Sequence, residues 1–154
     1  MNLFSANARS PFRLWKESKP TILLVEDEPD VRQVTRAVLE HAGYPVLESV
    51  GPEDALRLGN ENRGRIGLLL SDVVMPGMNG PELALQLQSL QPGLTTVFIS
   101  GYAESGVRRK VMQNGNPVYI QKPFTIDVLL SGVAKALQAQ SCDEGAHLPG
   151  LTAD

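Results

Sequence analysis

The sequence predicts an α/β fold in which helices cover both faces of a parallel β-sheet. Apolar runs of about four to six residues alternate with segments whose apolar residues recur at helical spacing, a pattern typical of βαβ units. The apolar runs are continuous rather than alternating, which indicates strands that are buried on both faces. Four of the runs end in acidic, hydroxyl or lysine side chains, at the edge of the sheet where α/β proteins form their sites.

The apolar runs predict five strands, and the segments between and after them predict five helices. The strands are expected near residues 21–25, 45–48, 66–71, 95–100 and 118–121. The helices are expected near residues 30–42, 52–60, 81–89, 104–114 and 126–139. Pro29, Pro52 and Pro81 each stand beside an acid, which favours a helix start because proline has no N–H to leave unpaired and the acid meets the positive end of the helix dipole. Thr125 can cap the last helix.

The first and fourth expected helices differ most in how much apolar surface they can bury. In the first helix, Val31, Val34 and Leu39 lie on one stripe with further apolar residues. The fourth has few apolar anchors and contains Gly106. Two interpretations of it stay open: a helix that moves, or one that is merely short and frayed.

The length of 154 residues suits one domain with short extensions. We expect the domain over residues 19–139, an N-terminal extension over 1–18 and a C-terminal tail over 140–154, because neither end shows a regular pattern. Aromatic and basic residues in the extension could form a short amphipathic helix, although a flexible extension is the favoured interpretation.

Composition excludes several classes of protein. A net charge of −3 gives no general attraction to nucleic acid, so we expect no direct nucleic-acid contact. Cys142 is the only cysteine, which rules out an internal disulfide and agrees with a reducing cytosol. The sequence has no apolar stretch typical of a signal peptide and no run long enough for a membrane span. A cytoplasmic protein is the expectation.

Charged and polar side chains follow four of the predicted strands. Glu26 and Asp27 follow the first strand, Asp72 the third, Ser100 the fourth and Lys122 the fifth. Because the carboxyl ends of parallel strands meet at one edge of the sheet, we expect these side chains to converge.

Three carboxylates cannot gather without compensation, since two like charges 4 Å apart repel by roughly 4 kcal/mol at an effective dielectric near 20. Lys122 supplies one positive charge, and a divalent cation fits the remainder. Oxygen ligands without His or Cys favour a hard ion such as Mg²⁺, which keeps waters and leaves a place for phosphate. An aspartate in such a site can attack a phosphoryl group and form an acyl phosphate.

Over about Lys19 to Gln138 the chain resembles the receiver domain of two-component response regulators. The resemblance rests on four segments that each close a strand and occur in the family's order: Val25-Glu26-Asp27-Glu28-Pro29, Asp72 through Gly80, Phe98-Ile99-Ser100-Gly101, and Lys122-Pro123-Phe124. Each segment alone is a weak signal, and together they are specific. The resemblance implies a doubly wound (βα)5 flavodoxin-like sandwich with strand order 2-1-3-4-5.

The resemblance also implies a role for each matching residue. Asp72 is expected to be the phosphoacceptor, with Lys122 contacting it and Ser100 moving toward the phosphoryl group. Tyr119 is expected to be the switch aromatic, whose ring rotates inward behind Ser100. The surface of the fourth helix, fifth strand and fifth helix would then change.

The metal site implied by the resemblance holds Mg²⁺ between Glu26, Asp27, Asp72 and the backbone carbonyl of Val74. Glu26 is expected to contribute through water, because its side chain is longer. The Lys122–Pro123 peptide bond is expected to be cis, which would aim Lys122 at the acceptor.

Two positions flank the path of the water that would hydrolyse the acyl phosphate in this family, and here they are Val74 and Tyr102. Neither side chain is an acid or amide suited to orienting a water molecule, so we expect a long-lived phosphorylated form. The alternative is that Tyr102 faces solvent and the lifetime is set elsewhere.

The expected function is a receiver that takes its phosphoryl group from a sensor histidine kinase or a histidine phosphotransfer protein. Such a protein catalyses only its own phosphorylation and dephosphorylation, so we do not expect an enzyme acting on other molecules. A phosphorelay intermediate, a receiver excised from a hybrid sensor kinase, and a homodimer stay open, and the downstream protein is unknown. An aspartyl phosphatase is a distant alternative, because that class requires a second acid, acting as a general acid, two residues after the nucleophile. This chain has Val74 at that position.

Overall fold

The computed structural model describes residues 19–101 and 117–146, with side chains described as far as residue 139. Within these residues a five-stranded parallel sheet has the order β2-β1-β3-β4-β5, which confirms the predicted order. The strands are β1 (Thr21–Val25), β2 (Val46–Ser49), β3 (Ile66–Asp72), β4 (Thr95–Ser100) and β5 (Val118–Gln121).

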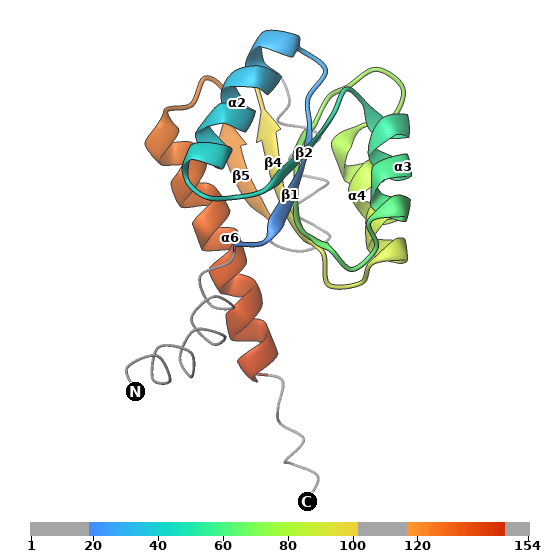
Figure 1. The fold of residues 1–154 in the computed structure, drawn as a ribbon, viewed down its shortest axis with the longest axis vertical. Coiled ribbons are helices and arrows are strands. Elements are labelled where there is room, and N and C mark those ends of the chain that lie inside the picture. The colour runs from blue at the N-terminus through green and yellow to red at the C-terminus, as the bar shows by residue number, and fades with distance from the viewer. Residues whose placement is uncertain (1–18, 102–116, 147–154) are drawn as a thin grey trace, which may run out of the picture.

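Helices cover both faces of this sheet, as expected for a doubly wound fold. The helices are α2 (Pro29–His41), α3 (Pro52–Glu61), α4 (Gly80–Leu90) and α6 (Ile126–Ala146). In Figure 1, α2 and α6 lie on one side of the strands and α3 and α4 on the other. The helix expected over 104–114 lies outside the described residues.

The sheet separates two apolar cores, and alternate residues of one strand feed both of them. Leu23 and Val25 of β1 belong to the core shared with α3 and α4. Ile22 and Leu24 of the same strand belong to the core shared with α2 and α6. All four side chains are at most 1% exposed, which explains why the strand is a continuous apolar run.

Helix starts follow the expected chemistry, with one difference. Pro29 and Pro52 each stand in the first turn of their helix, and Thr125 caps α6 by accepting a hydrogen bond from the Val128 N–H at 3.1 Å. Helix α4 begins at Gly80, one residue before the predicted proline start, because Asn79 caps it. The Asn79 side chain accepts from the Glu82 N–H at 2.8 Å, and the Glu82 carboxylate accepts from the Asn79 N–H at 3.1 Å.

The C-terminal helix corrects the expected end at residue 139. Helix α6 continues to Ala146 and extends beyond the sheet, so the first part of the expected tail is helical. The prediction ended the helix where its apolar stripe ends. A helix needs no apolar stripe to continue, and Gln, Ala and Glu in this stretch are good helix formers.

Candidate functional site

The register of the sheet brings the ends of four strands to one edge. Val25 pairs with Ser71, Asp72 with Ile99, and Ser100 with Gln121. Main-chain hydrogen bonds extend these pairings past the strands. The Val73 N–H donates to the Ile99 carbonyl at 2.9 Å, and the Lys122 N–H donates to the Ser100 carbonyl at 2.8 Å.

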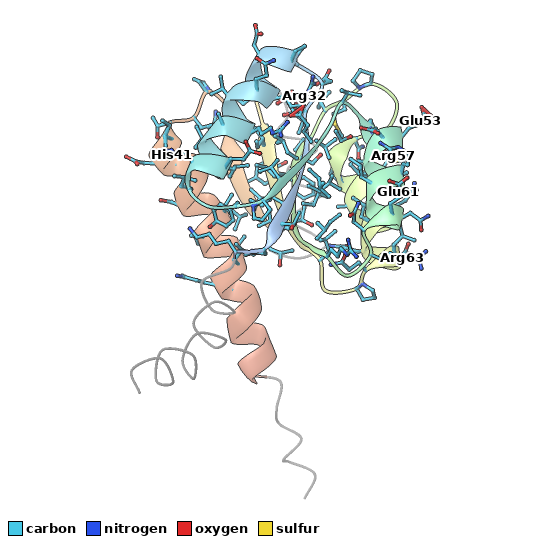
Figure 2. All side chains as sticks on the ribbon, in the orientation of Figure 1. Arg32, His41, Glu53, Arg57, Glu61 and Arg63 are labelled. Carbon is cyan, nitrogen blue, oxygen red and sulfur yellow. The ribbon has the colours of Figure 1, made fainter. Side chains whose placement is uncertain are left out.

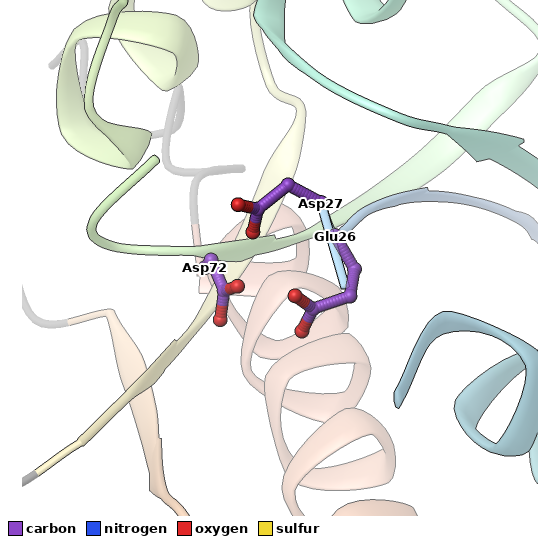
Figure 3. Close-up of side chains that lie close together, drawn as sticks. All are labelled: Glu26, Asp27 and Asp72. Atoms are coloured by element: carbon purple, nitrogen blue, oxygen red, sulfur yellow. The ribbon is translucent and has the colours of Figure 1, made fainter. Parts of the chain in front are cut away.

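Three carboxylates converge at this edge. One oxygen from each of Glu26, Asp27 and Asp72 lies within 4.8 Å of the others, and Figure 3 shows the three side chains turned toward a common centre. Glu26 is 2% exposed and Asp72 5%, whereas Asp27 faces solvent. The cluster is therefore a half-buried group of oxygen ligands with Asp27 on its solvent side.

Lys122 lies against this cluster and contacts three acids. Its ammonium nitrogen is 3.0 Å from Asp72 Oδ1, 3.2 Å from Glu26 Oε1 and 3.7 Å from Glu28 Oε1. The Lys122–Pro123 bond is cis, as expected. A single ammonium group cannot neutralise all of these carboxylates, so further positive charge is needed when they are ionised.

Burial and mutual repulsion set the protonation of the buried acids. Burial and the neighbouring Glu26 together raise the pKa of Asp72 to about 8, although Lys122 acts in the opposite direction. Burial also raises the pKa of Glu26, but hydrogen bonds from Asp72 and from the Glu28 N–H, together with Lys122, outweigh burial and lower it overall. Without a cation, burial and Glu26 therefore favour the protonated form of Asp72.

The same neighbours keep Lys122 charged. Burial lowers the pKa of the Lys122 ammonium group, but its hydrogen bonds and charge interactions with Asp72 and Glu26 outweigh burial and raise the pKa overall. Lys122 is thus a fixed positive charge beside Asp72.

The remaining expected site residues lie around this centre. Ser100 is buried at the end of β4, and Val74 lies exposed in the loop after β3. The Tyr119 ring packs against Phe98, with ring centroids 6.0 Å apart and planes at 41°. Tyr119 therefore already borders the core shared with α3 and α4. Tyr102 lies outside the described residues.

Two residues of the site were not anticipated from the sequence. Glu28 contacts Lys122 and donates its N–H to Glu26 Oε2 at 3.1 Å, and its place as the third acid of the first motif was the available signal. Arg32 donates from Nη1 to the Glu26 carbonyl at 2.9 Å, a contact that no local sequence pattern predicts.

A groove of about 660 Å³ lies beside Lys122. Its walls come from α2 and from the loop between β5 and α6, and they are mainly apolar. The lining residues are Asp30, Val31, Val34, Thr35, Gly101, Lys122, Pro123 and Phe124.

None of the helices in the described part of the chain is long and apolar enough to span a membrane.

Known proteins are similar to this chain in sequence and fold. Residues 22–134 match the response regulator receiver domain family. The sensor kinase CckA of Brucella abortus is 37% identical over 120 residues, which cover 78% of this chain and 13% of the kinase. The response regulator receiver protein CpdR of the same organism is 34% identical over 118 residues, which cover 77% of this chain and 97% of CpdR.

A solved structure agrees with these relatives. The CheY-like receiver domain protein from Methanospirillum hungatei JF-1 superposes with a TM-score of 0.74 at 28% identity, over 82% of this chain and 99% of that chain. The chain thus spans a small part of a sensor kinase and nearly the whole length of a single receiver. It belongs to the family of response regulator receiver domains of two-component systems.

Proposed function

We propose that the chain accepts a phosphoryl group on Asp72 from a sensor histidine kinase or a histidine phosphotransfer protein. One observation carries the proposal: the Asp72 carboxylate lies 3.0 Å from the Lys122 ammonium nitrogen and within 4.8 Å of oxygens of Glu26 and Asp27. A nucleophile, a fixed positive charge and a set of oxygen ligands thus meet at one point.

The transfer requires a single displacement at phosphorus. An ionised Asp72 oxygen attacks the phosphorus of a phosphohistidine, the new O–P bond forms as the N–P bond breaks, and the electron pair returns to the imidazole. Lys122 lies where it can offset charge on the phosphoryl oxygens, and the buried Ser100 hydroxyl is available to donate a hydrogen bond. The product is an aspartyl phosphate.

The acidic cluster fits a divalent cation. Glu26, Asp27 and Asp72 would hold it together with the Val74 backbone carbonyl, and an all-oxygen ligand set favours Mg²⁺. When bound, Mg²⁺ supplies positive charge that offsets the carboxylates and the incoming phosphoryl group. Asp72 must lose its proton both to bind the cation and to attack phosphorus.

The apolar groove supports a protein as the phosphodonor. It borders Lys122 and Gly101, so a partner seated on α2 and the loop after β5 would present its phosphohistidine next to Asp72.

The proposal includes a cytoplasmic location, because a histidine kinase draws its phosphoryl group from ATP. It also includes a switch in which Ser100 and Tyr119 couple the site to the surface of the following helices.

The two Brucella relatives support different roles. The 34% identity to the receiver protein CpdR, over 97% of its length, supports the role of a response regulator receiver, which is the role we propose. The 37% identity to the sensor kinase CckA supports a second candidate, a receiver of a hybrid kinase or phosphorelay.

Incubation with Mg²⁺ and acetyl phosphate, followed by intact-protein mass spectrometry, tests the acceptor. The wild type is expected to gain one phosphoryl group that hydroxylamine removes, as an acyl phosphate requires. Asp72→Asn is expected to gain none. The matched control Asp54→Asn removes an acid on α3 that pairs with Arg57, and it is expected to be labelled like the wild type. Equal labelling of Asp72→Asn would overturn the assignment.

A further inference from the structure

The peptide unit between Glu26 and Asp27 lies just past the last hydrogen bond between β1 and β2. The Glu26 N–H still donates to the Ser49 carbonyl, but at 3.3 Å this last bond between β1 and β2 is long. The carbonyl at the other end of Glu26 is held by a side chain instead: Arg32 Nη1 donates to it at 2.9 Å.

Holding this carbonyl constrains both acids at once. A peptide unit is planar, and the α-carbons of Glu26 and Asp27 are its two ends. Fixing the carbonyl oxygen therefore fixes the plane from which both side chains leave the backbone. Both side chains contribute oxygens to the acidic cluster with Asp72.

Arg32 is largely buried and has one further, longer contact across the sheet. Its side chain is 13% exposed, and its Nε faces Glu48 Oε1 of β2 at 3.8 Å. The second oxygen of Glu48 accepts from Arg36 Nη1 at 2.8 Å, and Arg36 Nε donates to Glu40 at 3.0 Å. The Arg32 side chain, labelled in Figure 2, thus connects α2 to the end of β1 and lies near Glu48 of β2.

We propose that Arg32 is a positioning residue that aims the Glu26 and Asp27 carboxylates at Asp72 before a cation binds. This inference rests on the proposed metal site. It also predicts whether removing the Arg32 side chain strengthens or weakens Mg²⁺ binding. By charge alone, a guanidinium near the cluster repels a cation, so its removal would strengthen Mg²⁺ binding. If the hydrogen bond to the Glu26 carbonyl is what matters, removal weakens Mg²⁺ binding.

The test compares Mg²⁺ dissociation constants of the wild type, Arg32→Met, Arg32→Lys and Arg36→Met, measured by NMR titration. Arg32→Met is expected to weaken binding about tenfold, as is typical when a residue behind a metal ligand is removed. Arg32→Lys keeps the charge but cannot hold both partners, so an intermediate loss is expected. Arg36→Met is the matched control on the same helix. Arg36 also pairs with Glu48, but its side chain is 44% exposed and its hydrogen bonds go to Glu40 and Glu48 rather than to the Glu26 carbonyl, so binding within about twofold of wild type is expected.

A second readout needs no metal. Hydrogen exchange of the Asp27 amide, which belongs to the held peptide unit, is expected to be faster in metal-free Arg32→Met than in the wild type or Arg36→Met. Melting temperatures of the two Met variants separate a local effect from general loss of stability.

Mg²⁺ binding by Arg32→Met that is equal to or tighter than wild type would overturn the positioning role, as would an unchanged Asp27 amide. A wild type that binds no Mg²⁺ would instead overturn the proposed metal site, so the two failures are distinct.

Discussion

Gly80 offers a direct test of how tightly the backbone around Asp72 is packed. It begins α4 and lies against the end of β3. A Cβ at this position would overlap the carbonyl oxygen of Asp72 and lie 3.2 Å from both the Asp72 carbonyl carbon and Val73 Cα. These are main-chain atoms, which cannot rotate away as a side chain can. The Gly80 N–H also donates to the Val73 carbonyl at 2.7 Å, which keeps the two segments together.

The expected cost of Gly80→Ala follows from these contacts. Forcing a methyl group into a packed region lowers the free energy of unfolding by about 1–3 kcal/mol. Gly80 is the first residue of α4, so the preference for alanine in the middle of a helix offsets little of this loss. For a chain of this length, a loss of about 1–3 kcal/mol lowers the melting temperature by about 2–12 °C.

Thermal unfolding followed by circular dichroism measures this change, and Gly51→Ala is the matched control. A Cβ on Gly51 meets no atom within 4 Å, and its backbone is extended with φ of −179°. Gly51 is the N-cap of α3, where alanine is less favourable than glycine, so a loss of only about 0.5 kcal/mol is expected. Added Mg²⁺ is expected to stabilise Gly80→Ala less than the wild type, because Asp72 is displaced. Equal melting temperatures for the two variants would show that the backbone yields freely, which would refute the reasoning.

Three further predictions concern the site itself. Asp27→Ala is expected to weaken Mg²⁺ binding at least tenfold, about 1.4 kcal/mol, through loss of a charged ligand; an unchanged titration would contradict this. Because the pKa of Asp72 is raised from 3.8 to about 8, the folded protein keeps a proton that the unfolded chain loses. Stability therefore falls as pH rises through that window, and Asp72→Asn is expected to raise the metal-free melting temperature more at about pH 8 than at about pH 5. A gain independent of pH would refute the assignment of the proton. From its sequence position alone, Tyr102→Ala is expected to speed loss of the phosphoryl group, and an equal decay rate would mean that the ring does not shield it.

The convergence of the site could be predicted because each of its side chains follows an apolar run directly. In a parallel sheet the carboxyl ends of all strands lie at the same edge. Asp72 after β3 and Lys122 after β5 therefore come together once the strands pair in register. The strand order followed from the resemblance, and it explains why the acids after β1 lie next to β3 rather than at an outer edge.

Local sequence patterns could not predict the contacts between different helices and strands. The bond from Arg32 to the Glu26 carbonyl depends on how α2 packs on the sheet, and neither residue type signals it. The close approach of Gly80 to Asp72 depends on the path of the whole loop from Val73 to Asn79. The proline signal at Pro81 placed the start of α4 to within one residue, and the cap at Asn79, which the prediction did not use, makes Gly80 the first residue.

The balance of charge at the site connects these observations to the proposed function. The sequence showed that the carboxylates needed compensation, but not how it is shared. The structure gives two contributors without a cation: Lys122, in contact with both buried acids, and the proton that burial and Glu26 keep on Asp72. In the proposed function Asp72 must release that proton before it can attack phosphorus. In that proposed function, cation binding and activation of the nucleophile would be linked, because both require Asp72 to give up the proton that burial and Glu26 favour.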